Sequence, residues 1–432
     1  MVVFHELHPS PLRCSAEDWQ SFTSTLGKES NPVLFDGLLS RGLLIRNAAG
    51  DDAELRFVRE QLEHKLDQPL ILYLLMAQGC NCSCTYCPVP GLAKIHGETL
   101  LSLQDGLAGL NLWLEDVRES RLRDDVYLIF YGGEPLLNKP VLTAIARHVH
   151  TLRASDESAA SIKMLIATNG VLIDDEILRL CVECDIKVTV GLDGPTPAND
   201  RLRVFPDGSG AFESAVASIR RLVAAGVDTS VSACITPFSL PSIHEMVPFL
   251  RELGVRKFGF NFLRGQALRE LLPAEEVGSF HKASAKAVIK SFRDYGLSAF
   301  EYQMEKKWLA FTKADFFPVD CTCYGNQLVV HPDGQLSNCP FFRGSVGHVR
   351  DVGADFRIAD DKVVKEWRRR LPLNSSAYEN CDAKSLCGGG CTSGSLATDT
   401  PSVDLGMKIF AEEVFDDFLW SSARIDGSQR RV

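Results

Sequence analysis

The sequence lacks the long apolar segments of membrane proteins. No apolar run approaches the roughly 20 residues that a membrane-spanning helix needs. The opening stretch, MVVFHELHPSPL, has no basic segment followed by an apolar one, so it does not read as a secretory signal peptide. These absences predict a cytoplasmic protein with no membrane partner.

An excess of basic residues is also missing. The 432 residues contain 46 Lys and Arg against 56 Asp and Glu, a formal net charge of −10. This balance disfavours broad binding to nucleic acids, and we expect no nucleic-acid partner. The chain is long enough for two or three domains with a large core.

Cysteine, in contrast, is abundant, with 14 residues. In a reducing compartment, clustered cysteines more often hold metal than form disulfides. The clusters lie at 80–87 and 321–391. Cys181 and Cys184 stand apart, at the end of an amphipathic helix before a strand, and we interpret them as buried small hydrophobic side chains.

Short β-rich apolar runs alternate with helical stretches from residue 70 onward. The predicted strands are 70–77, 126–131, 162–168, 187–193, 229–236 and 257–263. Repeated strand–helix alternation predicts a parallel sheet with right-handed crossovers. Six units favour an α/β fold with a partial (βα)6 TIM-like barrel over the closed eight-stranded form.

The chain divides into four predicted parts. A small α+β domain is expected at the N-terminus, and a Cys-rich module that starts with a hairpin turning at PDG follows the barrel. The last part is an amphipathic helix that packs back on the body. The boundaries are 1–69 for the N-terminal domain, 70–310 for the barrel, 311–400 for the Cys-rich module and 401–432 for the C-terminal helix.

Polar, Gly-rich or Cys-bearing segments follow the predicted strands, where barrels of this kind gather their functional residues. The first is QGCNCSCTYC, in which Cys80, Cys84 and Cys87 are spaced C-x3-C-x2-C. A [4Fe–4S] cluster normally takes four thiolates, one per iron, so three thiolates leave one iron open to a small molecule. By spacing alone, Cys82 could compete for that iron and close the site.

This cysteine loop after the first strand, with GGEP after the second, resembles the radical SAM superfamily over about residues 70–400. The resemblance implies that Cys80, Cys84 and Cys87 are the catalytic cluster's ligands and that S-adenosylmethionine (SAM) binds the open iron. One electron then cleaves SAM to methionine and a 5′-deoxyadenosyl radical. In this context Cys82 is predicted to be a non-ligand.

The resemblance also assigns residues that contact SAM. Tyr86, between two ligands, places an aromatic face near the adenine. Gly132 and Gly133 let the backbone approach the ligand closely, and Glu134 accepts hydrogen bonds from the ammonium group.

Two further strand ends carry candidates. Thr168 and Asn169, in TNG, supply polar groups where family members contact the sugar or amino-acid part of SAM. Asp193, in LDGP, is either a SAM contact or a turn cap.

The stretch that begins GLDGPTPANDRLR resembles the peptide-modifying branch of the family. On that alignment Arg203 pairs with the SAM carboxylate, a task that suits a guanidinium fork, and Arg201 is the fallback. The family's usual Ser and His are here Gly191 and Asn199, which puts the contacts at those two positions in doubt.

A second set of cysteines resembles the C-terminal SPASM module, whose motif is C-x9–15-G-x4-C followed by C-x2-C-x5-C-x3-C and a last Cys. Here Tyr378 replaces the leading Cys of the C-x2-C pair, and no cysteine follows the C-x3-C pair. The resemblance maps the first auxiliary cluster to Cys321, Cys323, Cys339 and Cys391. Only Cys381 and Cys387 remain for a second cluster.

The cofactor content of this module stays open. It could hold one auxiliary [4Fe–4S] cluster on the mapped four cysteines, one on a different four, or two clusters with non-Cys ligands completing the second. A zinc ribbon is the fourth alternative, because the spacing alone does not exclude it.

SPASM-bearing radical SAM enzymes mostly modify ribosomally made peptides. The resemblance implies an oxidoreductase of this kind, a peptide maturase that forms a thioether, C–C or ether crosslink or epimerises a residue. Its partners would be a precursor peptide with a leader and an electron donor of the flavodoxin or ferredoxin type. Residues 1–69 stand where such maturases carry a winged-helix domain that binds the leader by strand addition.

Other functions remain as alternatives. A radical SAM dehydrogenase of a sugar or alcohol is the first, and a non-catalytic electron-transfer protein is the second. Sulfatase-maturating relatives carry a catalytic Asp directly after the G-x4-C cysteine. Here Pro340 follows Cys339, so formylglycine synthesis is disfavoured.

Overall fold

The central feature of the protein is a ten-stranded sheet with the strand order β12-β11-β10-β3-β4-β5-β6-β7-β8-β9. The computed structural model describes residues 2–5, 8–13, 17, 20, 32–40, 48–87, 99–120, 125–263, 265–295, 300–301, 319, 321–341, 344–375, 388, 391, 408–409 and 413.

Six parallel strands form the barrel part of this sheet, each paired with the next along the chain. Each lies within two residues of its predicted bounds, so the predicted parallel αβ architecture is confirmed. A two-residue strand, β9 (Phe300–Glu301), follows them. The six are β3 (Ile71–Ala77), β4 (Val126–Gly132), β5 (Ile162–Thr168), β6 (Ile186–Gly191), β7 (Thr229–Ile235) and β8 (Lys257–Phe262).

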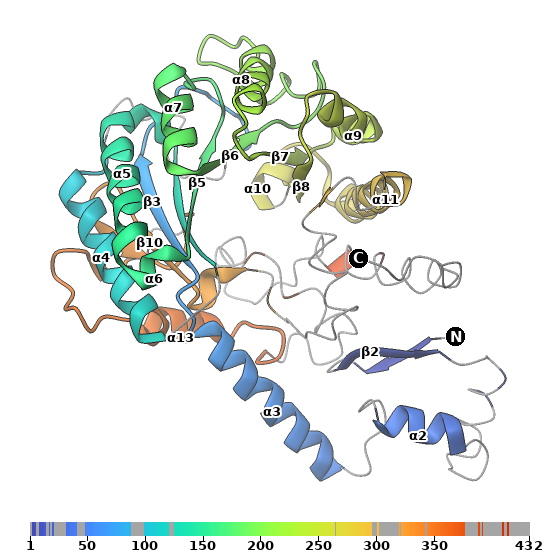
Figure 1. Ribbon diagram of the computed structural model, residues 1–432. Helices are drawn as coiled ribbons and strands as arrows, with labels where there is room; N and C mark the ends of the chain where they lie inside the picture. The colour runs from blue at the N-terminus through green and yellow to red at the C-terminus, as the bar shows by residue number, and fades with distance from the viewer. Residues whose placement is uncertain are drawn as a thin grey trace.

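Helices between the strands cover the outer, convex side of the curved sheet (Figure 1). They are α4 (Leu103–Ser120), α5 (Lys139–Ser155), α6 (Glu157–Ala160), α7 (Asp175–Cys184), α8 (Phe212–Ala224), α9 (Ile243–Glu252), α10 (Gly265–Arg269) and α11 (Val277–Tyr295). Short 3-10 helices are η2 (Pro135–Asn138), η3 (Leu240–Ser242), η4 (Ala274–Glu276), η6 (Thr322–Tyr324) and η7 (Ile358–Asp360).

The alternation of side chains along each strand sorts the two faces of the sheet. On β7, Val231 and Ala233 are buried in the core beneath the helices, whereas Ser230, Ser232 and Cys234 alternate with them and are only half-buried. The inner face of the barrel is therefore partly polar at this strand. On α7, Cys181 and Cys184 are buried in the core, as predicted.

A C-terminal hairpin extends the barrel sheet at its first strand. β10 (Gln327–Val330) pairs antiparallel with β11 (Gln335–Ser337), which pairs with β12 (Gly347–His348), and the predicted turn at PDG is confirmed. β10 also runs parallel to β3. The hairpin is thus continuous with the barrel and covers the backbone groups that an edge strand would otherwise expose.

The N-terminal region contains a hairpin that the sequence did not predict, of β1 (Val2–His5) and β2 (His8–Arg13). It also contains α2 (Pro32–Ser40) and α3 (Ala48–Leu66). Figure 1 shows α3 leading from this region to the barrel.

The C-terminal end of α3 packs on the module that carries the second cysteine set. Leu62 and Leu66 share a buried cluster with Cys323, Tyr324 and Trp367 of this module. In this module, α13 (Lys362–Arg368) ends in a buried arginine. Its Nε donates to the carbonyl oxygen of Tyr324 at 2.7 Å, and its Nη2 donates to that of Leu66 at 3.2 Å.

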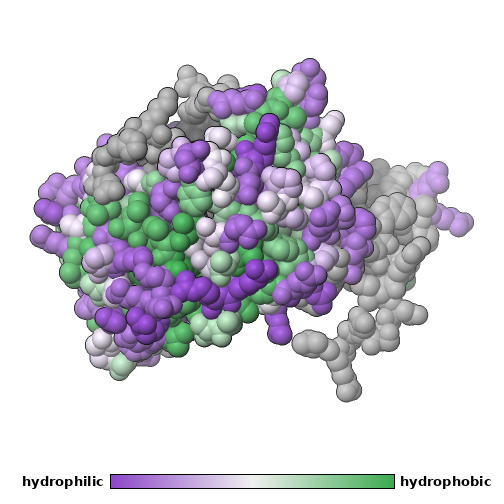
Figure 2. Space-filling view, turned by 90° about the horizontal axis from the view of Figure 1, so that it is seen from above, coloured by the Kyte–Doolittle hydropathy of each residue, from purple (hydrophilic) through white to green (hydrophobic). Residues whose placement is uncertain are grey.

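The predicted C-terminal helix lies mostly outside the described residues. Of the described positions, Ile409 packs against the barrel core, and the carboxylate of Glu413 lies 3.2 Å from the ammonium of Lys282 on α11. None of the helices in the described part of the chain is long and apolar enough to span a membrane. Figure 2 shows hydrophilic and hydrophobic side chains interleaved across one face of the molecule.

Candidate functional site

The loop after β3 carries the predicted cluster ligands. Cys80 and Cys84 are half-buried and Cys87 is exposed. The backbone N–H groups of Ser83 and Thr85 donate to carbonyl oxygens of the loop after β6 at 2.7 and 3.1 Å, which holds the cysteine loop across the barrel edge. Burial raises the pKa of Cys84 to about 11, and the charges of Cys87 and Cys80 raise it further, so the three thiols lie close enough to interact.

Cys82 lies beside Cys80 as a hydrogen-bond donor. The Cys82 backbone N–H is 3.4 Å from the Cys80 sulfur, and hydrogen bonds from Cys82 lower the pKa of Cys80 to about 6. The side-chain amide of Asn169 also donates to this sulfur, at 3.6 Å. A low pKa favours the thiolate, which is the form that binds iron.

GGEP forms the neighbouring part of the site, at the end of β4. Gly132 has φ +124°, and an ideal Cβ on it would lie 2.6 Å from the carbonyl oxygen of Ala77, so only glycine fits there. Glu134 is buried, and its carboxylate accepts from the Thr168 hydroxyl at 2.6 Å and from the Asn169 backbone N–H at 2.9 Å. Burial raises the pKa of Glu134 to about 7, although these hydrogen bonds act in the opposite direction.

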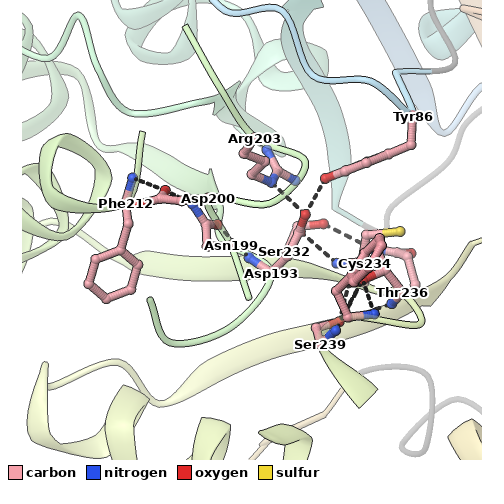
Figure 3. Close-up of polar contacts among 12 residues, drawn as sticks. Tyr86, Asp193, Asn199, Asp200, Arg203, Phe212, Ser232, Cys234, Thr236 and Ser239 are labelled. Atoms are coloured by element: carbon pink, nitrogen blue, oxygen red, sulfur yellow. Dashed lines mark hydrogen bonds and ion pairs between the residues drawn. The ribbon is translucent and has the colours of Figure 1, made fainter. Parts of the chain in front are cut away.

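Asp193 lies at the centre of a second group of residues (Figure 3). Its Oδ2 accepts from the Tyr86 hydroxyl and forms an ion pair with Arg203 Nε at 2.8 Å. Its Oδ1 accepts from the Cys234 backbone N–H at 2.9 Å. The Arg203 guanidinium also lies 5.6 Å from the centroid of the Tyr86 ring, within the range of a cation–π contact.

The ionisation of this group follows from its burial and pairing. Burial, followed by the negative charge of Asp193, raises the pKa of Tyr86 well above its usual value. Burial alone would lower the pKa of Arg203, but Asp193 raises it well above the usual range. Tyr86 is therefore a neutral donor and Arg203 a fixed cation.

The structure separates the two candidate arginines. Arg203 turns into the site, whereas Arg201 is exposed, with its guanidinium 5.2 Å from the centroid of the Phe238 ring. An ideal Cβ at Gly191 would lie 2.5 Å from Arg203 Nη1, so the glycine makes room for this arginine. Asn199 Oδ1 accepts from the Asp193 backbone N–H at 3.0 Å.

Sequence reasoning missed two of these contributions. Asn199 was treated as a departure from the family pattern, and Cys234 was placed outside the cysteine clusters. Cys234 contributes its backbone N–H, and a backbone contact cannot be predicted from the type of the residue. The position of Asn199 just after the LDGP strand end was the only available signal.

Four cysteines of the second set come together. Cys323 and Cys339 are buried, and Cys321 and Cys391 are half-buried. Burial raises the pKa of Cys323 well above its usual value, and the thiols of Cys321, Cys339 and Cys391 raise it further, so each of these three thiols lies near Cys323. Cys381, Cys387 and Tyr378 lie outside the described residues.

The number of cysteines in each set is compatible with a [4Fe–4S] cluster, with three thiols in the first set and four in the second. Among the described residues, no group of three or more His, Cys, Asp or Glu side chains converges closely enough to hold one metal ion. A [4Fe–4S] cluster distributes its thiolates over separate irons, so its ligands surround it without meeting at one point.

A cavity of about 240 Å³ lies between the ends of β3 and β4 and the C-terminal hairpin region. Gly132 and Gln78 line it from the barrel, and His331 and Pro340 line it from the C-terminal hairpin region. Pro340 adjoins Cys339 in the sequence, and no cysteine lines the cavity among the described residues.

Comparison with known proteins shows what this chain is similar to. Residues 74–253 match the model of the radical SAM superfamily. The mycofactocin maturase MftC of Mycobacterium ulcerans is 24% identical, covering 79% of this chain and 88% of the relative. A serine-type anaerobic sulfatase-maturating enzyme of Klebsiella pneumoniae is 26% identical, covering 78% and 86%.

Two solved structures share the fold. Native anSMEcpe with bound AdoMet superposes with a TM-score of 0.67 at 17% identity, covering 82% of this chain and 98% of that one. Streptococcus suis SuiB bound to the precursor peptide SuiA superposes with a TM-score of 0.51 at 15% identity, covering 93% and 98%. Residues 74–253 are thus similar to the radical SAM superfamily, and most of the chain is similar in sequence to these maturases.

Proposed function

We propose that this enzyme uses SAM to modify a ribosomally made peptide or protein. The observation that carries the proposal is the meeting of the three-cysteine loop, Glu134 and Arg203 at one edge of the barrel. These groups come from three different strand ends. Together they offer thiolates for an iron–sulfur cluster, an acceptor for the amino group of SAM and a cation for its carboxylate.

The residues have distinct roles in this proposal. Cys80, Cys84 and Cys87 hold three irons of a [4Fe–4S] cluster, which supplies one electron and an open iron for the cleavage of SAM. Glu134 accepts hydrogen bonds from the amino end of SAM, and Arg203 pairs with its carboxylate.

Backbone and ring contacts complete the proposed SAM site. Gly132 and Gly133 admit the ligand close to the main chain, and the Tyr86 ring lies against the adenine. Thr168 and Asn169 hold Glu134 in place through the hydrogen bonds described above, so they orient the acceptor.

The C-terminal module, 311–400, is proposed to hold an auxiliary [4Fe–4S] cluster on Cys321, Cys323, Cys339 and Cys391. Their proximity supports this ligand set. Iron and sulfide counts test it, because about eight irons per chain indicate two clusters in all and about twelve indicate three.

A peptide substrate is supported by the relatives, which include maturases and a structure with a precursor peptide bound. Residues 1–69 are proposed to bind its leader, and a flavodoxin or ferredoxin to deliver the electron. The product would carry a crosslink or an epimerised residue. Pro340 offers no base beside Cys339, so formylglycine synthesis stays disfavoured, and no observation favours a small-molecule dehydrogenase.

The test is anaerobic reconstitution followed by reduction with dithionite in the presence of SAM. We expect 5′-deoxyadenosine, and with a peptide encoded beside the gene we expect either a loss of two hydrogen masses for a crosslink or no mass change for epimerisation. The absence of 5′-deoxyadenosine under strict anaerobiosis would contradict the radical mechanism.

A further inference from the structure

Asp193 joins three segments that are distant in the sequence. Tyr86 comes from the loop after β3, Arg203 from the loop after β6, and Cys234 from the end of β7. All three engage one carboxylate that is 1% exposed (Figure 3). Both carboxylate oxygens of Asp193 therefore interact with protein groups, although the family resemblance predicts a SAM contact as one of the two roles for this residue.

Asp193 is itself held by a chain of hydrogen bonds. Its backbone N–H donates to Asn199, whose side-chain amide donates to Asp200 Oδ1 at 3.0 Å. The same Asp200 oxygen accepts from the Phe212 backbone N–H at 2.9 Å, at the start of α8. The carboxylate is thus supported by the helix that follows the loop, which restricts its motion.

The ion pair with Asp193 uses the Nε side of the Arg203 guanidinium and leaves its two terminal nitrogens for the proposed SAM site. Nε is the guanidinium nitrogen of the ion pair, 2.8 Å from Asp193 Oδ2 without hydrogen-bond geometry, and in the described part of the chain no hydrogen bond engages Nη1 or Nη2. These two terminal nitrogens form an edge that matches both oxygens of a carboxylate. Gly191 lies under this edge, because an ideal Cβ there would be 2.5 Å from Nη1 and 3.0 Å from Nη2.

We infer that Asp193 is a positioning residue that presents the terminal edge of Arg203 to the SAM carboxylate and holds the Tyr86 ring in the cysteine loop. It does so without touching SAM. This inference rests on the proposed SAM site. It makes Asp193, Gly191 and Arg203 one unit, in which the aspartate orients the arginine and the glycine provides its space.

A double-mutant cycle tests the inference on the anaerobically reconstituted holoenzyme, with equilibrium SAM binding as the readout. We expect Arg203→Ala to weaken binding about 100-fold, as for loss of a bidentate charged pair, and Asp193→Asn to weaken it about tenfold. Residues that act through one another are not additive, so the double variant should lose less SAM affinity than the two single losses combined. Additive losses would mean that Asp193 contacts SAM itself and would overturn the inference.

One further variant and one spectroscopic measurement separate positioning from folding. Gly191→Ala displaces the guanidinium without changing Asp193, and we expect weaker SAM binding with unchanged iron content. The electron paramagnetic resonance spectrum of the reduced cluster should shift on adding SAM in the wild type, and shift less in Asp193→Asn. If Asp193→Asn lowers only the unfolding temperature and leaves SAM affinity and this spectral shift unchanged, the role is structural and the inference is wrong.

The proposed function can fail separately. A wild-type enzyme that binds SAM without forming 5′-deoxyadenosine would contradict the proposed function. A wild-type enzyme that cleaves SAM while Asp193→Asn binds it normally would contradict only the inference.

Discussion

The two cysteine regions of this molecule differ in what surrounds their sulfur atoms. In the loop after β3, Cys87 is exposed, and the charged side chain of Arg203 lies near Cys84. In the C-terminal module, Cys323 is 1% exposed and Cys339 5%, within a cluster of apolar side chains. The first region is open to a ligand, whereas the second is enclosed, an environment that shields a bound group from solvent.

The two regions are also anchored differently. Side chains at neighbouring strand ends hold the first, through Asn169 on Cys80 and Asp193 on Tyr86. Backbone carbonyl groups of the α3 end hold the second, because Asn326 donates to the oxygens of Lys65 and Gln68 at 2.6 and 2.9 Å. Binding geometry in the first region depends on individual side chains, and stability in the second depends on packing between elements.

The largest expected effect comes from removing a ligand of the open region. Cys84→Ala should abolish SAM cleavage, because the cluster would lose one of its three thiolates. Cys82→Ser is the matched control in the same loop and should keep cleavage largely intact. 5′-Deoxyadenosine formation and iron content measure both variants, and cleavage retained by Cys84→Ala would contradict the ligand assignment.

Removing a ligand of the enclosed region should have a different consequence. Cys323→Ala should lower iron content by about four per chain, one cluster, while the core site still cleaves SAM. Modification of the peptide substrate should be lost, because the second cluster is absent. Loss of SAM cleavage together with the iron would show that the two regions are not independent.

The anchoring of the enclosed region predicts a smaller change in stability. Arg368→Met leaves the buried carbonyl oxygens of Tyr324 and Leu66 without their donor, at a cost of about 2 kcal/mol. Its ion pairs with Glu63 and Asp67 add little, because both carboxylates are about half exposed. The temperature of unfolding should fall by a few degrees, and should stay unchanged in the control Arg369→Met, whose side chain is exposed.

The smallest expected effect is a pH dependence in the open region. The pKa of Glu134, about 7, means that its carboxylate becomes protonated as the pH falls below 7. Protonation removes an acceptor for the amino end of SAM, so affinity should fall by up to about tenfold per pH unit below 7. Glu134→Gln should bind more weakly at pH 8 and lose this dependence between pH 6 and 8, whereas an unchanged slope would exclude Glu134 as its origin.

Much of the fold followed from local patterns. The β-rich runs and helical stretches predicted six strands to within two residues, because side-chain periodicity along the chain reflects burial directly. The PDG turn and the buried pair Cys181 and Cys184 followed in the same way. The N-terminal hairpin was missed, and the pairing of β10 with β3 was not anticipated, because contacts between distant strands leave no local pattern.

By itself the sequence determined which chemical groups exist and how they are spaced within single loops. The C-x3-C-x2-C loop, GGEP and the family resemblance all depend on residues close in the chain. The family resemblance already favoured Arg203 over Arg201 and grouped Cys391 with Cys321, Cys323 and Cys339. Only the tertiary structure placed Arg203 and Tyr86 against Asp193 and brought the thiols of the second set close to Cys323. These contacts join residues 10 to 107 positions apart through folded loops and strands, so they depend on how the elements pack together.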